Sequence, residues 1–206
     1  DGEITAPAKL LLEYISVCQL GRIDVELRNT DIKIDTQNDA TVIKGIAAQD
    51  FPLVPPINKN ITYGVSVQEL KTSLQKVMFA VSKNEARPEL CGVFMDFNST
   101  KEGVLTLAAT DSYRLAEKKT TLMASFGEKQ YSKETQKIIV PGKTIQEVLR
   151  VIGLFHEDEA QTPLEIAIQE NQIVFSYGMF EIYSRLIEGK YPDYTQIIPN
   201  HFKTSV

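Results

Sequence analysis

The chain has 206 residues, of which 43% are hydrophobic and 24% are charged, and its formal net charge at pH 7 is −5. These values are typical of a globular protein with one or two domains, and no run approaches the ~18 apolar residues that a membrane-spanning helix requires. The acidic balance argues against a general affinity for nucleic acids, although DNA binding depends on how positive charge is distributed rather than on its sum.

An internal repeat organises the chain. Residues 4–15 read ITAPAKLLLEYI and residues 138–149 read IIVPGKTIQEVL, so that one proline and one lysine align. Both copies continue into a segment in which apolar and polar residues alternate, at 23–35 and 164–176, as expected for paired antiparallel strands. The chain therefore contains two copies of one unit, at a spacing too long for a solenoid.

After its proline, each copy places apolar residues at the spacing of a helix that buries one face. These residues are Leu11, Tyr14, Ile15 and Cys18 in the first copy and Ile145, Val148, Leu149 and Ile152 in the second. Each unit is therefore predicted to be a strand, then a helix, then an antiparallel sheet.

The segment between the two copies follows the same plan. Ser66 and Glu69 have the spacing of a capping box, in which each side chain bonds the other residue's backbone N–H at the start of a helix. Strands are predicted at 92–97, 104–110 and 112–119. The predicted buried face of the helix consists of Val67, Leu70, Leu74, Val77, Met78 and Val81.

We therefore predict an α+β fold in which the doubled unit places helices on one face and an antiparallel sheet on the other. Residues 58–200 hold two units and form a complete domain, whereas residues 1–57 hold one unit, which is half of such a domain. The segment PLVPPINKN at 52–60 is the predicted linker.

Positive charge gathers on the predicted helices. Lys76 and Lys83 are seven residues apart, as are Lys143 and Arg150, and that spacing corresponds to two helical turns. We expect these four side chains to share one concave helical face. That face is either a plain solvated surface or a surface that contacts phosphates without reading the base sequence.

No catalytic constellation is apparent. His156 lies in an acidic loop with Asp158 and Glu159, His201 lies near the C-terminus, and neither histidine has a nucleophile motif around it. The two cysteines, Cys18 and Cys91, lie far apart on apolar segments without other ligands nearby, so reduced thiols, a cytoplasmic location and no metal or cofactor are expected.

Asp111 and Arg114, in the segment ATDSYRLA, allow two interpretations. They form either a structural ion pair at the end of a strand or a recognition feature on an exposed edge.

Four segments carry a resemblance to one family. They are RPELCGVFMDF at 87–97, ATDSYRLA at 109–116, IIVPGKTIQEVLR at 138–150 and EGKYPDYTQIIP at 188–199. In order and spacing they resemble the motifs of the bacterial sliding clamps, the beta subunits of DNA polymerase III, from Gly2 to about Pro199. That family forms a closed ring of two chains, each with three domains of the doubled plan, with helices lining the hole through which duplex DNA passes.

The resemblance implies that the chain is a fragment of such a clamp. Residues 1–57 would be the second half of domain 1, residues 58–200 would be the middle domain, and residues 201–206 would begin the linker to a third domain. Its implied role is a processivity factor in DNA replication, without catalysis. The full-length protein would form the homodimeric ring, which is not expected of these 206 residues.

The resemblance also implies a hydrophobic pocket for peptides of the Gln-Leu-x-Leu-Phe type, carried by the polymerase III catalytic subunit, the clamp loader and repair proteins. Its residues would be Leu90, Thr110, Ser112, Tyr113, Arg114, Leu115, Pro192, Gln196 and Ile197. Tyr113 stands where the family usually has His, and Gln196 where Arg is common. The implied DNA-facing residues are Lys9, Lys71, Lys76, Lys83, Arg87, Lys143 and Arg150.

Two other classes of function are alternatives to the clamp. A stand-alone peptide-binding adaptor would use the cleft of Leu90, Leu115 and Ile197 and never meet DNA. An enzyme acting through Asp111 or His156 is disfavoured, because no nucleophile is paired with a base.

Overall fold

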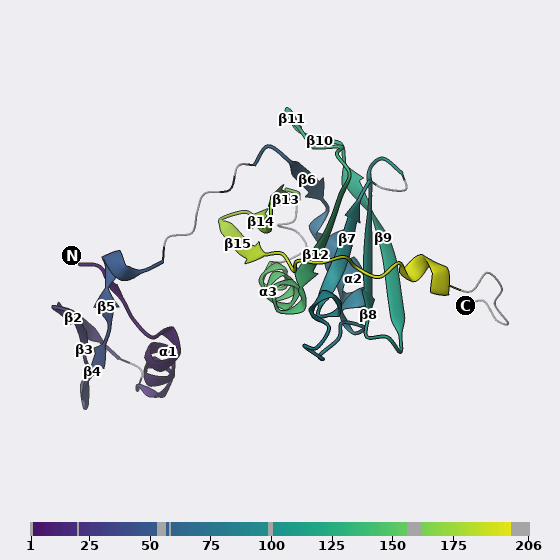
Figure 1. Cartoon of the computed structure of the whole chain (residues 1–206). Coiled ribbons are helices and arrows are strands. Elements are labelled where there is room, and N and C mark those ends of the chain that lie inside the picture. The colour runs from purple at the N-terminus through teal and green to yellow at the C-terminus, as the bar shows by residue number, and fades with distance from the viewer. Residues whose placement is uncertain are drawn as a thin grey trace. The chain divides into compact units, whose positions relative to one another are not determined.

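The structure is a computed structural model that describes residues 2–19, 21–52, 57, 59–98, 101–155 and 162–198. The chain divides into two compact units, residues 1–56 and 57–206 (Figure 1). His156, Asp158, Glu159, His201, the tail 201–206 and much of the predicted linker lie outside the described residues. None of the described helices has the length and apolar character needed to cross a membrane.

Unit 2 is built on one eight-stranded antiparallel sheet whose strand order is β12-β7-β8-β9-β6-β13-β14-β15. Its strands are β6 (Thr62–Val65), β7 (Gly92–Phe97), β8 (Val104–Thr110), β9 (Leu115–Met123), β12 (Gln136–Pro141), β13 (Leu164–Gln169), β14 (Gln172–Tyr177) and β15 (Phe180–Arg185). A small hairpin, β10 (Ser125–Phe126) and β11 (Lys129–Gln130), and the 3-10 turns η2 (Pro88–Leu90) and η4 (Tyr194–Ile197) complete the unit.

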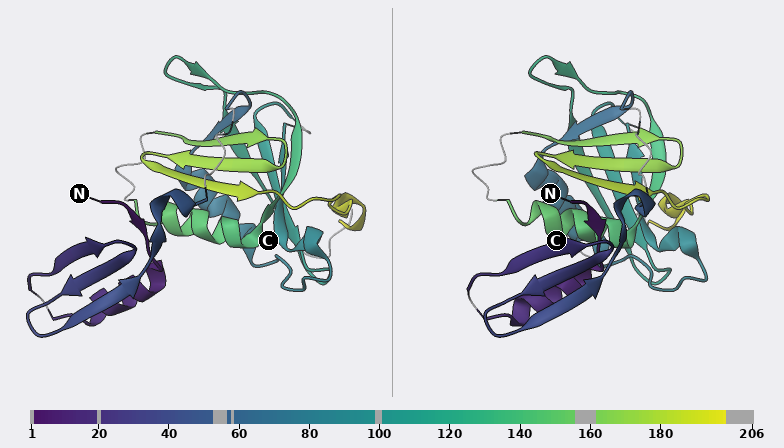
Figure 2. Two further views of the ribbon diagram at one scale, coloured as in Figure 1. Left: turned by 60° about the vertical axis from the view of Figure 1, so that its left-hand side comes forward. Right: turned by 90° about the vertical axis from the view of Figure 1, so that its left-hand side faces the viewer.

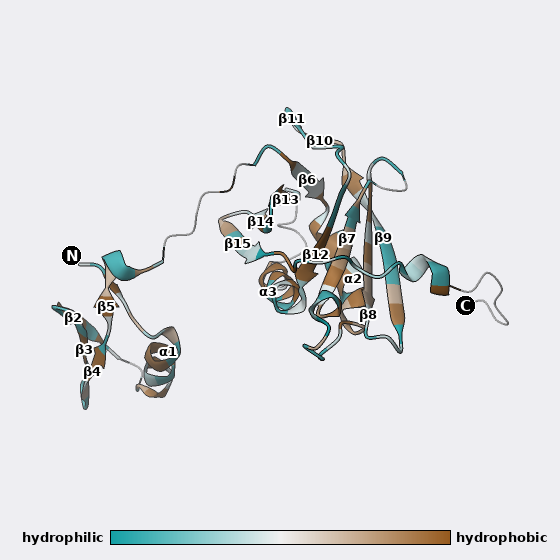
Figure 3. Cartoon of the chain, in the orientation of Figure 1, coloured by the Kyte–Doolittle hydropathy of each residue, from teal (hydrophilic) through white to brown (hydrophobic). Residues whose placement is uncertain are grey.

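Two helices, α2 (Val67–Met78) and α3 (Gly142–Ile152), pack against this sheet and against each other (Figures 1 and 2). Because side chains alternate across a strand, each strand contributes every second residue to the core beneath the helices. Phe97 stacks there on Tyr63, with ring centroids 4.2 Å apart. Much of β7, β12 and α3 is coloured hydrophobic in Figure 3. The predicted α+β fold, with helices on one side and sheet on the other, is confirmed.

The two repeats within unit 2 are joined by an exchange of their first strands. Strand β6 of the first repeat pairs with β13 of the second, while β12 of the second pairs with β7 of the first. Each repeat thus covers the open edge that the other presents.

The structure corrects the predicted capping box and the predicted start of one strand. Ser66 is the residue before α2, but its side chain makes no capping hydrogen bond, and Glu69 instead accepts one from Thr120 Oγ1 at 3.2 Å. Strand β9 begins at Leu115 rather than at residue 112, because the preceding residues form a turn.

Lys83 is not on a helix, so its helical spacing from Lys76 was a wrong inference. Helix α2 ends at Met78. Beyond it, i to i−3 hydrogen bonds from Ala80 N and Val81 N tighten the chain into a turn, and Ser82 N then bonds Leu90 O.

Unit 1 consists of a single repeat. It contains β1 (Ile4–Thr5), α1 (Ala8–Val17), β2 (Asp24–Arg28), β3 (Asp31–Asp35), β4 (Ala40–Lys44), β5 (Ile46–Ala47) and the 3-10 turn η1 (Ala48–Asp50). Its three-stranded sheet, in the order β2-β3-β4, has a small core centred on Ile32, Ile34 and Ile43.

The repeat seen in the sequence is confirmed in strand registers. In unit 1 Asp24 pairs with Asp35, and in unit 2 Glu165 pairs with Ser176, a shift of 141 residues on both strands. The next ladders keep the same shift, because Asp31 pairs with Lys44 and Gln172 pairs with Arg185. The strand that follows each of these hairpins, β4 in unit 1 and β15 in unit 2, was not predicted.

The equivalent hairpin turns of the two repeats place their first residue in the left-handed region. Asn29 has φ of 55° and Glu170 has φ of 49°. Asparagine tolerates that conformation, whereas a longer side chain is strained there. We predict that Glu170→Asn raises the free energy of unfolding by roughly 0.5–1 kcal/mol, measured by urea denaturation.

Gln169→Asn provides the control, because Gln169 is an ordinary strand residue and asparagine is disfavoured in strands. If Glu170→Asn proves no more stabilising than Gln169→Asn, backbone strain at the turn is not the cause.

Candidate functional site

A second apolar cluster lies on the sheet face opposite the helices. Alternation along β7, β8 and β12 sends Phe94, Ala108 and Ile139 to this face, while their neighbours point into the main core. The cluster, which we call the outer-face cluster, comprises Leu90, Ala108, Ile139, Tyr191 and Tyr194, with Phe94, Leu115 and Ile187 packed against it.

The segment after β15 closes over this cluster. Ile187 N donates to Ile139 O at 2.9 Å, and the Phe94 ring stacks on Tyr191 with centroids 4.9 Å apart. Burial raises the pKa of Tyr191 to about 12. The Tyr194 hydroxyl donates to Glu117 Oε2 at 2.7 Å, which ties the turn η4 to strand β9.

The turn between β8 and β9 is held by one carboxylate. Asp111 Oδ1 accepts from the backbone N–H groups of Tyr113 and Arg114, each at 3.0 Å, and Asp111 Oδ2 lies 2.9 Å from Arg114 Nε. These backbone donors, followed by the Arg114 guanidinium, hold the pKa of Asp111 below its usual value. The structural ion pair is therefore present, and it orients Arg114 over the Phe79 ring at 5.6 Å from the centroid.

Thr110 closes the same turn from the strand side. Its hydroxyl donates to Arg114 O at 2.8 Å and accepts from Ser112 N at 3.2 Å. Ser112 has φ of 78°, which turns the chain sharply. As a result Tyr113 projects outward and is 98% exposed.

A hollow of about 300 Å³ lies between this turn and the loop after α2. Leu90, Ser112 and Tyr113 line it, together with Lys83 and Arg87. Arg87 contacts the turn directly, with Nη1 donating to Ser112 Oγ at 3.3 Å. The site therefore has an apolar floor at Leu90 and a cationic rim.

Gly92 belongs to the segment RPELCGVFMDF beside this hollow, and the packing of two strands requires a glycine there. A Cβ atom at Gly92 would lie 2.5 Å from Val140 O, a separation that no side chain can accept. Glycine therefore lets β7 and β12 approach each other closely at the start of β7.

The nine predicted pocket residues fall into three groups. Leu90, Thr110, Ser112, Tyr113, Arg114 and Leu115 lie at the outer-face cluster, the turn and the 300 Å³ hollow. Pro192 instead lines a larger hollow of about 910 Å³ beside β12 and the segment after β15.

The remaining two pocket residues lie on η4. Gln196 and Ile197 are exposed there, and Gln196 Nε2 donates to Asp193 Oδ2 at 2.7 Å. Tyr191 and Tyr194, which anchor this segment, were missed as site residues. The motif KYPDYTQIIP contained both, but its aromatic residues gave no sign of which sheet face they cover.

The predicted DNA-facing residues are only partly brought together. Lys76 on α2 and Lys143 and Arg150 on α3 are exposed on helices that lie on one face of the sheet. Lys71 is half-buried, about 140° around α2 from Lys76.

Lys83 and Arg87 lie at the 300 Å³ hollow instead of on a helix. Three ion pairs reduce the free positive charge: Arg150 with Glu147 at 2.7 Å, Arg87 with Glu89 at 3.1 Å and, in unit 1, Lys9 with Glu13 at 3.7 Å.

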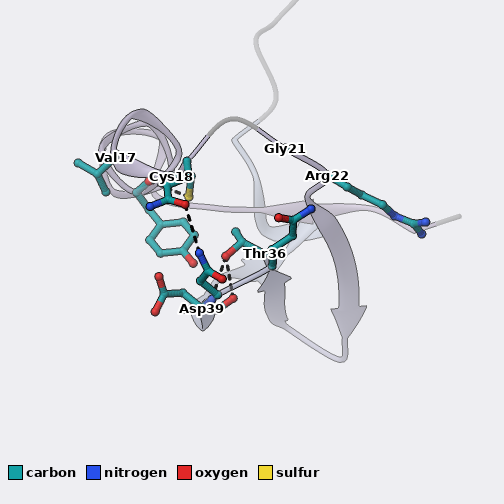
Figure 4. A pocket seen from close by; sticks show the side chains of 10 residues that line it. Val17, Cys18, Gly21, Arg22, Thr36 and Asp39 are labelled. Carbon is teal, nitrogen blue, oxygen red and sulfur yellow. Dashed lines mark hydrogen bonds between the residues drawn. The ribbon is translucent and has the colours of Figure 1, made fainter.

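Unit 1 has a smaller hollow of about 160 Å³ where the end of α1 meets the loop after β3 (Figure 4). Cys18 Sγ bonds Tyr14 O at 3.2 Å, and Thr36 and Asp39 bond each other across the loop. The polar groups of these residues thus bond one another, and the hollow presents no set of groups suited to a ligand. Among the described residues, no three His, Cys, Asp or Glu side chains form a possible metal site.

Comparison with known proteins gives consistent matches. Residues 64–193 match the family model described as DNA polymerase III beta subunit, central domain. The beta sliding clamp of Halalkalibacterium halodurans is 30% identical over 206 residues, which is all of this chain and 51% of that protein. The chain thus spans about half the length of the curated relatives that it matches.

Solved structures agree. The sliding clamp of Bacillus subtilis aligns with a TM-score of 0.77 at 27% identity, covering 96% of this chain and 49% of that one. A clamp of Pseudomonas aeruginosa bound to griselimycin aligns with a TM-score of 0.79 at 25% identity, covering 98% of this chain and 51% of that one.

The role assigned to Asp111 can be tested by hydrogen exchange. Asp111→Ala removes the acceptor of two backbone N–H groups and the partner of Arg114, so the amides of Tyr113 and Arg114 should exchange several-fold faster. Asp111→Asn retains one oxygen acceptor and should fall between Asp111→Ala and the parent. Equal exchange in all three proteins would show that the strand ends alone hold the turn.

Proposed function

The chain belongs to the DNA polymerase III beta subunit family, and we propose that it is part of a DNA sliding clamp that holds partner proteins on duplex DNA. The observation that carries this proposal is the site on the outer sheet face, where an ordered turn orients Arg114 and the adjoining Leu115 packs in the apolar cluster of Leu90. We further propose residues 58–200 as the middle domain of the clamp and residues 1–57 as the second half of domain 1. The chain's role is binding without chemistry, in the cytoplasm.

The proposed ligand of the outer-face site is a short peptide of the Gln-Leu-x-Leu-Phe type. The half-buried Leu115 and the exposed Ile197 offer apolar surface to its hydrophobic side chains, and the buried Leu90 packs beneath Leu115 in the same cluster. Arg114 keeps guanidinium donors in reach of peptide carbonyls or carboxylates, because Asp111 engages only its Nε among the contacts found. Such a site combines apolar anchoring with a few orienting polar groups.

The proposed DNA contact involves the opposite side of unit 2. Lys76, Lys143 and Arg150 stand on helices, and long basic side chains without interleaved aromatic residues suit phosphate contact rather than base reading. The proposed ring of two full-length chains would enclose the DNA, so that the clamp would stay on the duplex even where individual contacts are weak. This chain is not expected to close that ring.

The peptide site can be tested by titrating the protein with a fluorescent Gln-Leu-x-Leu-Phe peptide. Leu115→Asp should weaken binding at least tenfold, because it places a carboxylate in the apolar floor. Leu154→Asp, at an exposed leucine after α3, is the matched control and should bind as the parent does. If the parent does not bind, or if both variants bind equally, the site assignment is wrong.

The DNA contact can be tested by measuring duplex affinity as a function of salt. Lys76→Glu should weaken binding and lower the slope of log affinity against log salt by about 1. Lys137→Glu changes a lysine on the other sheet face, where it pairs with Asp96 at 3.5 Å, and should have little effect. Equal effects of the two changes, or no binding by the parent, would favour an adaptor that does not meet DNA.

A further inference from the structure

The first strands of the two repeats in unit 2 differ in how the chain covers them. Thr62 of β6 points its backbone groups away from β13, because the preceding residue, Ile61, is the one whose carbonyl accepts from Ile168 N and these directions alternate along a strand. Ser132 N donates to the Thr62 carbonyl at 2.7 Å. The segment after β9 therefore covers this side of β6.

Strand β12 holds the equivalent place in the second repeat and lies at one end of the sheet order. Counted back from the N-cap residues of α2 and α3, Thr62 corresponds to Lys137. Ile139 O accepts from Ile187 N at 2.9 Å, so Lys137, two residues earlier, points its backbone groups to the same side. Within the described parts of the chain, no backbone N–H donates to the Lys137 carbonyl. Strand β12 is therefore open at Lys137.

A proline accounts for the difference. Tyr131 packs on Gly64 of β6, and Tyr191 packs in the outer-face cluster with the equivalent residue of β12. The two tyrosines thus cover equivalent places. The residue after Tyr131 is Ser132, whose N–H bonds the strand, whereas the residue after Tyr191 is Pro192. Because proline has no backbone N–H, the second segment cannot make the same bond.

The hollow of about 910 Å³ lies at this open edge. Lys137 and Ile139 of β12 line it, together with Glu170 and Asn171 of the turn after β13 and with the segment 186–195. All of these residues belong to unit 2. The volume falls in the range of about 300–1,000 Å³ that is usual for ligand sites.

In the first repeat the chain itself runs through the corresponding gap. Glu134 O there accepts from Tyr63 Oη at 2.8 Å and from Asn98 Nδ2 at 3.4 Å. Asn98 begins the turn after β7 with a positive φ, as Glu170 begins the turn after β13. Residues 132–134 therefore run between a strand edge and a hairpin turn. Among the described residues, the second repeat has the gap without such a segment.

The charges at the hollow favour a basic occupant. Apart from Lys137, which pairs with Asp96 at 3.5 Å, three carboxylates and one ammonium group line it. These charged residues are Glu170, Glu188, Lys190 and Asp193. The excess of negative charge attracts positively charged side chains and disfavours acidic ones.

We propose that this hollow binds an extended peptide segment of a partner protein, in which basic and apolar residues alternate, and that the segment adds to β12 as residues 132–134 add to β6. A backbone N–H of the peptide donates to the Lys137 carbonyl, and its basic side chains face Glu170 and Glu188. Open strand edges recruit extended peptides in this way. The site is separate from the proposed Gln-Leu-x-Leu-Phe site and does not rest on the proposed function.

The probe is the blocked peptide Val-Lys-Val-Lys-Val-Lys, added to the 206-residue chain while its backbone amide resonances are followed. Saturable shifts should appear on residues 136–139, 170–171 and 187–190. The same peptide with every backbone nitrogen methylated keeps the side chains but has no N–H, so it should bind about fivefold more weakly or worse, the loss of one hydrogen bond. Val-Glu-Val-Glu-Val-Glu should not bind.

A matched pair of protein variants tests the charge. Glu188→Lys should weaken binding of the basic peptide several-fold, because it reverses a charge at the hollow. Glu128→Lys makes the same change at the exposed tip of the β10–β11 hairpin and should bind as the parent does. The amide spectrum of each variant shows that the fold is kept.

Four results would overturn the proposal. They are the absence of saturable shifts up to millimolar peptide, equal binding of the methylated peptide, equal effects of the two lysine substitutions, and shifts confined to residues 110–115, which would place the peptide at the outer-face cluster. Shifts of residues 136–139 on dilution of the protein alone would show that a second copy occupies the hollow instead.

Discussion

A strand–helix–hairpin unit cannot bury its own apolar face, and the rest of this structure depends on that constraint. In the first repeat of unit 2, for example, the first strand β6 pairs with β9 of its own repeat on one side and with β13 of the other repeat on its other side. In unit 2 the two repeats meet the requirement reciprocally, through the β6–β13 and β12–β7 ladders. The main core, with Tyr63, Phe97 and Ile166 almost wholly buried, forms only because both ladders close.

The position of the candidate site follows from this closure. Once alternate residues of β7, β8 and β12 are committed to the helix side, the intervening ones must face outward. There they are covered by the segment that carries Tyr191 and Tyr194. The turn at Asp111 stands at the end of the β8–β9 pair, so the sheet fixes its location and the carboxylate fixes its shape. The proposed partner-binding site and the proposed DNA contact therefore lie on opposite faces of one sheet.

Much of this arrangement could be predicted from the sequence. Strands β7 and β8 begin and end where alternation and the polar turn indicated, and the repeat alignment reproduces two ladders residue by residue. The predictions failed where a tertiary contact outweighed a local pattern. The end of α2 at Met78 depends on the bond between Ser82 and Leu90, and Glu69 is engaged by Thr120 from a distant strand. Likewise, the roles of Tyr191 and Tyr194 depend on which sheet face the last segment crosses, which no local spacing records.

The outer-face cluster and its turn form the proposed partner-binding site. The most direct measurement is to follow the backbone amide resonances of the 206-residue chain while a Gln-Leu-x-Leu-Phe peptide is added. If the peptide binds there, the largest shifts fall on residues 110–115 and on η4. Shifts concentrated on α2 and α3, or confined to unit 1, would contradict it.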